Sequence, residues 1–129
     1  MDTVMIKCNE LMVGDWVALN PNFPMQIEDA GDDYAYATWE GNEGDPWEFD
    51  DKDYQPQPIP ITPEILVKNG WWRDTEGMWQ HLETHLCIGK WNGRYHFYDI
   101  DQIKLYSVHQ VQQVLRLSGM TDMANNFKI

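Results

Sequence analysis

The first 61 residues alternate between short apolar runs and turn-forming residues, a pattern typical of small β-strands. The clearest alternation covers residues 34–39, where Tyr34, Tyr36 and Thr38 are predicted to share one face of a strand. Further strands are expected over residues 16–19, 25–28 and 47–49. Short strands joined by tight turns predict a small β-barrel-like region of SH3-like style over residues 1–61.

A proline-rich segment and a helix signal mark the start of a second region. Residues 55–61 must be extended, because proline fixes its own φ and restricts the residue before it. Thr62 then predicts a helix N-cap, with Pro63 as the first helical residue and Asn69-Gly70 as the stop. Residues 62–129 are therefore predicted to form a second region.

This second region is expected to contain a helix, an antiparallel meander and a final helix, packed as one unit. The meander should cover residues 71–106, with a hairpin turn at Asn92-Gly93. Ser107 and Gln110 predict a capping box at the start of the last helix. Residues 120–129 are expected to form a tail, of which 126–129 offer one more edge strand. The predicted fold class is α+β.

The negative charge is concentrated in one segment, between Glu28 and Asp53. Eleven of the 21 acidic residues lie there and Lys52 is the only base, so the segment carries −10 of the formal −12. Such a block repels polyphosphate and attracts basic partners. We therefore expect a protein partner, with no direct binding to nucleic acid or to an anionic membrane.

Two interpretations of the acidic segment are open. In the first, it is a solvated loop surface that keeps the protein soluble. In the second, its carboxylates imitate the phosphates of DNA, and interleaved aromatic side chains grip a basic DNA-binding protein. The candidate partner-binding residues are Asp32, Asp33, Trp39, Trp47, Asp50, Asp51 and Asp53.

The remaining composition predicts a folded cytoplasmic protein. Aromatic residues make up 13% of the chain, whereas disordered acidic chains contain few. The N-terminus lacks the basic and apolar parts of a secretion signal, and no apolar run approaches the ~20 residues of a membrane helix. Cys8 and Cys87 are therefore expected to be reduced thiols, and no cofactor is expected.

The most enzyme-like pattern is the run from His81 to His85, followed by Cys87. On one strand, residues 81, 83, 85 and 87 would share a face, and His96 would approach from the partner strand. Imidazole, carboxylate and thiolate suit zinc or iron. His81, His85 and His96 are thus the candidate ligands of a small metal-dependent enzyme.

The alternative for the same residues is the solvent-facing side of a sheet. Its inner face would then carry Leu82, Leu86 and Ile88. Residues two apart on a strand lie ~6–7 Å from each other, so three of them rarely converge on one ion. A turn at Glu83-Thr84 would also break the shared face.

His109 lies in the first turn of the predicted final helix, where the helix dipole favours a neutral imidazole. It is either a packing and hydrogen-bonding residue or a catalytic one. No serine or cysteine lies in a recognisable nucleophile motif, and no glycine-rich phosphate loop is present. These observations favour a non-enzymatic role.

Three segments, in this order, carry a resemblance. Residues 10–17 (ELMVGDWV) resemble an ELRIGNWV-like opening, residues 58–66 (PIPITPEIL) resemble a PIPLTEEIL segment, and residues 106–112 (YSVHQVQ) resemble the start of a YVHQLQNLYFALTG helix. Together they are similar to a group of small uncharacterised proteins of Bacteroidetes genomes, prophages and mobile elements. The last helix departs from that pattern after Gln112, where this chain is more polar. The resemblance implies a small accessory protein of a phage or mobile element that acts by protein–protein contact, and it implies no catalytic residues.

Overall fold

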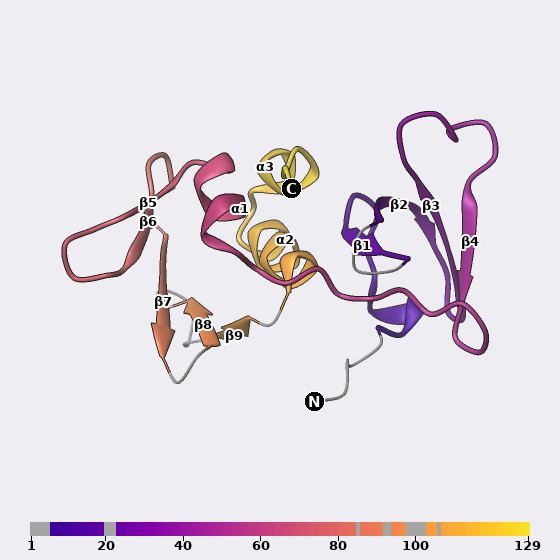
Figure 1. Cartoon of the computed structure of the whole chain (residues 1–129), viewed down its shortest axis with the longest axis horizontal. Coiled ribbons are helices and arrows are strands. Elements are labelled where there is room, and N and C mark those ends of the chain that lie inside the picture. Colours follow the sequence, from indigo (N-terminus) through magenta and orange to yellow (C-terminus); the bar gives the residue numbers. More distant parts are fainter. Residues whose placement is uncertain (1–5, 20–22, 85, 92–93, 98–102, 106) are drawn as a thin grey trace. The chain divides into compact units, whose positions relative to one another are not determined.

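The computed structural model describes residues 6–19, 23–84, 86–91, 94–97, 103–105 and 107–129. They divide into two compact units. Unit 1 comprises Met1–Ile59 and Ser107–Asn126, and unit 2 comprises Pro60–Tyr106 and Phe127–Ile129. Both contain antiparallel strands and short helices, so the α+β class is confirmed (Figure 1).

Unit 1 is built on an antiparallel sheet in the order β1-β2-β3-β4. A 3₁₀ turn, η1 (Cys8–Glu10), is followed by β1 (Trp16–Ala18), β2 (Pro24–Ala30), β3 (Tyr34–Thr38) and β4 (Trp47–Asp50). The sequence predicted each of these strands to within two residues of its bounds. Short apolar runs between turn residues were therefore a sufficient local signal here.

The alternation along β3 decides which side chains enter the core of unit 1. Ala35 and Ala37 are fully buried, while Tyr34, Tyr36 and Thr38 lie on the opposite face, as predicted. The core side chains are Ile6, Cys8, Leu11, Val17, Met25, Ile27, Ala35, Ala37 and Phe49. The core therefore lies on one side of the sheet and leaves the other side to polar residues.

The sheet of unit 1 is open. Among the described residues β1 does not pair with β4, so the strands do not close into a barrel. Instead, Gln57 and Ala18 exchange two backbone hydrogen bonds, of 2.9 and 2.8 Å, at the free edge of β1. Pro56 and Pro58 on either side of Gln57 have no N–H, so the edge of this segment that faces away from β1 offers no donor at these two positions.

The last two helices, α2 (Val108–Leu117) and α3 (Thr121–Asn125), fall in unit 1. The sequence instead placed the residues of both helices in a second region over residues 62–129. The predicted capping box of Ser107 and Gln110 is confirmed, and in it Gln110 Oε1 accepts the backbone N–H of Ser107 at 3.1 Å. The physical reason for the difference is a set of buried polar contacts between α2 and the residues around the start of β1.

Gln112 on α2 is completely buried and satisfies three backbone groups. Its side chain accepts the N–H of Trp16 at 2.8 Å and donates to the carbonyl oxygens of Gly14 and Ala124, at 2.8 and 3.0 Å. One amide therefore connects β1, α2 and α3.

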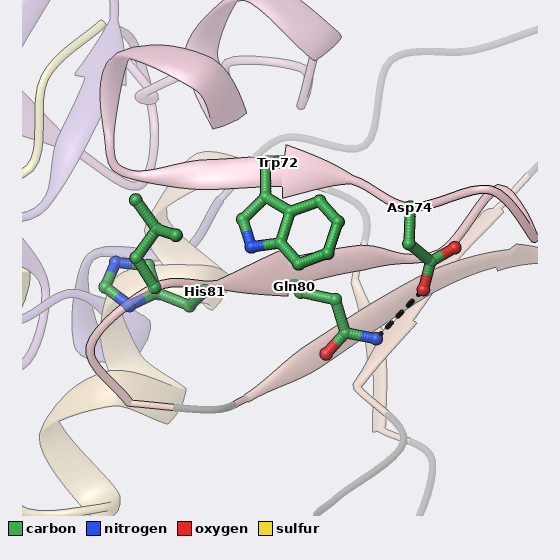
Figure 2. A pocket seen from close by; sticks show the side chains of 5 residues that line it. Trp72, Asp74, Gln80 and His81 are labelled. Atoms are coloured by element: carbon green, nitrogen blue, oxygen red, sulfur yellow. Dashed lines mark hydrogen bonds between the residues drawn. The ribbon is translucent and has the colours of Figure 1, made fainter.

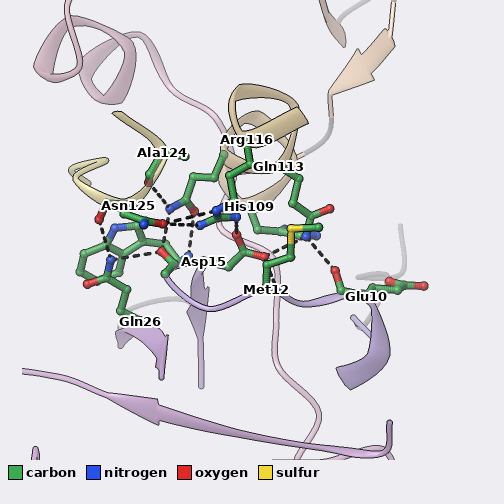
Figure 3. Close-up of polar contacts among 12 residues, drawn as sticks. Glu10, Met12, Asp15, Gln26, His109, Gln113, Arg116, Ala124 and Asn125 are labelled. Atoms are coloured by element: carbon green, nitrogen blue, oxygen red, sulfur yellow. Dashed lines mark hydrogen bonds and ion pairs between the residues drawn. The ribbon is translucent and has the colours of Figure 1, made fainter. Parts of the chain in front are cut away.

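Asp15 is the second buried polar residue of this contact (Figure 3). Its carboxylate accepts the backbone N–H of Met12 at 2.9 Å and the side-chain amide of Gln113 at 2.8 Å, and it forms an ion pair with Arg116. A buried carboxylate is tolerated when its partners replace the lost water in this way. Gly14 precedes it with φ +94°, and a Cβ there would lie 2.9 Å from the Arg116 guanidinium.

Unit 2 is an antiparallel meander in the order β5-β6-β7-β8-β9, preceded by a short helix. The elements are α1 (Pro63–Lys68), β5 (Trp71–Arg73), β6 (Trp79–His81), β7 (Cys87–Trp91), β8 (Arg94–Phe97) and β9 (Ile103–Leu105). The predicted helix signal is confirmed, because Thr62 Oγ1 accepts the N–H of Ile65 at 3.2 Å. The predicted turn at Asn92-Gly93 lies outside the described residues.

Residues 120–129 differ from the expected tail and edge strand. Thr121–Asn125 form α3, and residues 127–129 pair with no strand of the described sheets. Instead, the side chain of Asn69 donates to the carbonyl of Lys128 and accepts its N–H, both at 2.7 Å. The side-chain amide of Asn69, at the end of α1, therefore satisfies the backbone groups of Lys128 that a neighbouring strand was expected to pair with.

Replacing Gln112 with leucine should destabilise the protein strongly. The apolar side chain removes the Gln112 acceptor from the Trp16 N–H and one donor each from the Gly14 and Ala124 carbonyl groups, at a cost of about 3 kcal/mol in the free energy of unfolding. Urea denaturation measures this. Leu117→Ala on the exposed side of the same helix is the control and should change stability by less than about 0.5 kcal/mol. Equal losses for both variants would show that the Gln112 amide is unimportant.

Candidate functional site

The outer face of the unit 1 sheet gathers acidic and aromatic side chains from three strands. The register sets Asp29 opposite Tyr36, Tyr36 opposite Glu48, and Tyr34 opposite Asp50. Side chains directly opposite each other have Cβ atoms about 4.5–5.5 Å apart. We call Asp29, Tyr34, Tyr36, Glu48 and Asp50 the acidic face.

A β-bulge in β2 is what brings Asp29 to this face. Ile27 pairs with Ala37 and points into the core, and the next pair joins Asp29 to Tyr36, so Glu28 is an extra residue. In a regular strand, Asp29 would share the core side with Ile27 because side chains alternate with a period of two. The bulge therefore moves a carboxylate from the core side to the solvent side.

The two tyrosines form the centre of the acidic face. Their rings meet edge to face with centroids 5.6 Å apart, and Tyr34 is 38% exposed. The Tyr36 hydroxyl donates to Glu48 at 3.4 Å, and the Glu48 carboxylate raises the pKa of Tyr36. Exposed aromatic rings flanked by carboxylates attract cations by Coulomb and cation–π forces together.

Four of the five predicted aspartates come together at one end of this sheet. Asp33, Asp50, Asp51 and Asp53 line a surface depression of about 260 Å³ together with Lys52. Asp32 is exposed on the same connection between β2 and β3. The turn that follows β4 contributes Asp51, Lys52 and Asp53 to this depression.

Two of these aspartates also hold the backbone. Asp50 Oδ1 accepts the N–H groups of Asp53 and Lys52, at 2.6 and 2.8 Å, and these donors lower the pKa of Asp50. Asp51 accepts the backbone N–H of Cys8 at 2.9 Å. Asp32, Asp33 and Asp53 are exposed, so they are the members of the cluster most accessible to a partner.

The predicted aromatic members of the site, Trp39 and Trp47, lie on the core side instead. Both are half-buried and pack against the core of unit 1. Trp39 meets Phe23 edge to face at 5.0 Å, and Trp47 meets Tyr54 at 5.6 Å between ring centroids. Among the interleaved aromatic residues, sequence reasoning thus chose two packing residues as site candidates, although the alternation along β3 places Tyr34 and Tyr36 on the outer face.

The metal candidates His81 and His96 lie on opposite faces of the unit 2 sheet. His81 pairs with Trp71, whose ring contacts Phe97, so His81 belongs to the core side. Phe97 is the neighbour of His96 on β8, and neighbouring residues on a strand point to opposite sides. His85 lies outside the described residues.

The prediction that residues 81, 83, 85 and 87 lie on one strand and share a face is wrong. Residues 82–84 form a turn, and Cys87 pairs with Gln80, which points away from the side of His81. Leu82 is exposed in this turn, whereas Leu86 and Ile88 are buried as expected for the inner face. The turn at Glu83-Thr84 that the sequence offered as an alternative is the one that forms.

Both ring nitrogens of His81 hold the backbone. Nε2 lies 3.0 Å from the carbonyl oxygen of Asn69, and Nδ1 accepts the N–H groups of Glu83 and Thr84 at 3.2 and 3.3 Å. No lone pair is left for a metal ion. Within the part of the chain that the structure describes, no group of three or more His, Cys, Asp or Glu side chains is placed to hold one.

Ser107 and His109 form a buried Ser–His pair. Ser107 Oγ lies 2.7 Å from His109 Nδ1, and the two residues are only 1% and 6% exposed. Burial lowers the pKa of His109, against an opposite influence of the Asp15 and Glu10 carboxylates. A substrate has no access to this hydroxyl, so the geometry is that of a packing and hydrogen-bonding histidine.

Both cysteines are free thiols in the structure. Cys8 is fully buried, and burial together with a hydrogen bond to Asp51 raises its pKa to about 12. Cys87 is half-buried and lies 3.5 Å from the amide nitrogen of Gln80. Cys8 is therefore a core residue and lacks the thiolate that a nucleophile or metal ligand needs.

No protein-family model matches this chain, and no curated protein or solved structure matches it either. Among the described residues, no helix has both the length and the apolar character needed to span a membrane.

Protonation of His109 should destabilise the fold as the pH falls. Its pKa is lowered in the folded state, so the unfolded chain binds the proton more readily below about pH 6.5. The free energy of unfolding should thus be highest above that pH and decline between pH 7.5 and 5.5. Urea denaturation of the wild type and of His109→Gln at both pH values checks this. The decline should be smaller in the variant, and identical declines would contradict it.

Cys8 should resist alkylation as long as the protein is folded. The thiolate is the reactive form, and neither solvent nor base reaches it in the core. In a Cys87→Ser variant, iodoacetamide at pH 8 should leave Cys8 unmodified over a time in which the urea-unfolded chain is fully alkylated. Mass spectrometry measures the fraction. Modification at the same rate in both states would show that Cys8 is accessible.

Proposed function

We propose that this protein is a non-enzymatic accessory protein of a phage or mobile element that works in the cytoplasm by protein–protein contact. The contact surface is the acidic face, continued by the exposed aspartates at the end of the sheet, and the partner surface is basic. The observation that supports this is the pairing of Tyr34 and Tyr36 on β3 with carboxylates on both neighbouring strands. For residues 1–61 we propose an SH3-like architecture, supported by the bridge between Gln57 and β1.

The chemistry of this face favours a basic protein surface over other occupants. Lys52 is the only base between Glu28 and Asp53, so carboxylates dominate the field there. Charge of one sign speeds association with a partner of the opposite sign, and tyrosines provide contact area at low entropic cost. A nucleic acid or an anionic membrane would be repelled by the same field.

A second candidate function is inhibition of a nucleic-acid-binding protein by imitation of DNA. The clustering of Asp33, Asp50, Asp51 and Asp53 around one depression favours it, because several closely spaced negative charges resemble a run of phosphates. This is a special case of the same contact. It differs only in the identity of the basic partner and in the expectation that DNA competes with the protein.

The test compares two variants that remove equal charge. Asp29→Asn with Glu48→Gln neutralises the acidic face, and Glu83→Gln with Asp122→Asn removes two exposed carboxylates elsewhere. Each tagged chain is used to capture proteins from a Bacteroidetes lysate at about 50 mM and about 500 mM salt, where screening differs strongly. A basic partner should bind the wild type and the control at low salt, and its capture by the face variant should fall several-fold.

The outcomes separate the candidates. Addition of duplex DNA should release the partner if the protein imitates DNA, and should leave it bound if the contact is of another kind. A partner that binds the wild type and the face variant equally, at either salt concentration, would remove the acidic face from the contact and return the acidic segment to a solubility role.

A further inference from the structure

Unit 2 carries a surface depression of about 320 Å³ next to the exposed side of β5 and β6 (Figure 2). It is lined by Trp72, Asp74, Gln80, His81 and Leu82. Trp72 is 45% exposed and Leu82 68% exposed, so the wall includes an indole ring and an isobutyl group that the fold leaves open. The volume is at the lower limit of ligand cavities and suits a single side chain better than a cofactor.

The side chains around the depression are held in place by the turn between β5 and β6. Asp74 Oδ1 accepts the N–H groups of Glu76 and Met78, both at 2.9 Å, and Asp74 Oδ2 accepts the amide of Gln80 at 3.1 Å. The Gln80 amide and the Met78 and Glu76 N–H groups lower the pKa of Asp74, which is therefore charged at neutral pH. Trp72 pairs with Gln80 across the two strands, so the indole and the amide lie side by side.

The polar atoms of the depression that are left for a ligand are mainly acceptors. The amide nitrogen of Gln80 already donates to Asp74 and lies 3.5 Å from the Cys87 sulfur, which leaves its Oε1 as the open atom. Both nitrogens of His81 are used by the backbone. Apart from the indole N–H of Trp72, the site therefore offers acceptors beside an aromatic ring.

Charge complementarity further limits the chemical groups that this depression could bind. The carboxylate of Asp74 would repel an acidic group, and a purely apolar group would strip water from two acceptors without replacing it. The neighbouring base, Arg73, pairs with Trp79 and belongs to the other face of the sheet, so it does not neutralise Asp74 from within the depression. The chain as a whole carries a formal charge of −12.

We propose that this depression binds an arginine side chain of a partner protein. The guanidinium stacks on the indole of Trp72 and donates to Asp74 Oδ2 and Gln80 Oε1, while its methylene stem lies against Leu82. Arginine fits better than lysine because it is planar, has five N–H donors in a fixed fork and no acceptor, and stacks on aromatic rings. The site is separate from the acidic face and does not depend on the function proposed for it.

Three blocked tripeptides with a central arginine, lysine or citrulline test the proposal. Each is titrated into the full-length ¹⁵N-labelled protein, and the indole signal of Trp72 is assigned from a Trp72→Phe variant. The arginine peptide should shift the Trp72 indole signal and the amide signals of Gln80 and Leu82. The lysine peptide has the same charge and should bind at least threefold more weakly than the arginine peptide, because its ammonium group cannot stack on the Trp72 indole as a guanidinium does. Citrulline has nearly the same shape without the charge and should bind at least tenfold more weakly.

Two variants locate the binding. Trp72→Ala should weaken the arginine peptide about fivefold or more, and Asp74→Asn should weaken it by a similar factor while its Oδ1 still accepts the turn N–H groups. Tyr54→Ala is the matched control, since it removes another exposed aromatic ring beside carboxylates and should leave the affinity unchanged. Circular dichroism verifies the fold of each variant. If Asp74→Asn proves to be unfolded, the Trp72→Ala variant and the citrulline peptide together test the proposal.

The proposal is overturned by equal affinities for the arginine and lysine peptides, which would indicate general attraction to a negatively charged protein. Undiminished binding to Trp72→Ala would overturn it too. So would shifts confined to the signals of Tyr34 and Tyr36, because the peptide would then occupy the acidic face.

Discussion

The buried contact between α2 and the start of β1 determines where the candidate site of unit 1 lies. Gln112 and Asp15 fix residues 14–16 by side-chain hydrogen bonds, and the same short segment sets the register of β2. Gly14 N–H donates to the Ile27 carbonyl and Ile27 N–H donates to the Asp15 carbonyl, both at 2.8 Å. Ile27 is the last regular residue before the bulge, so the helix contact holds β2 up to the point where the bulge turns Asp29 outward.

Crowding eleven carboxylates into one segment is costly for a compact fold, because like charges repel. Part of this repulsion is offset by backbone N–H donors. Asp50 and Glu43 each accept such donors in tight turns, and these bonds lower the pKa of both groups. Asp51 accepts the backbone N–H of Cys8 in the same way, and the exposed carboxylates of the segment face water, where screening limits the repulsion. The acidic segment thus stabilises its own turns and still presents charge to the solvent.

The sequence predicted the features that depend on neighbouring residues. Alternation located the strands, and Thr62 with Pro63 located the start of α1. It could not predict the partner of α2, because Gln112 reads as a solvent-facing residue and only the fold shows that it satisfies three backbone groups. The bulge after Ile27 was also hidden, since it depends on the strand that pairs with it.

The division of unit 1 into two stretches of chain has a consequence for biosynthesis. The helices that complete this unit come from Ser107–Asn126, after the whole of Pro60–Tyr106 has been made. At about 5–20 residues per second, a ribosome needs roughly 2–10 s to cover that interval. During this time the emerging sheet of β1–β4 lacks the amide that contacts Trp16 and Gly14, so its lasting assembly has to wait until residues 107–126 have been made.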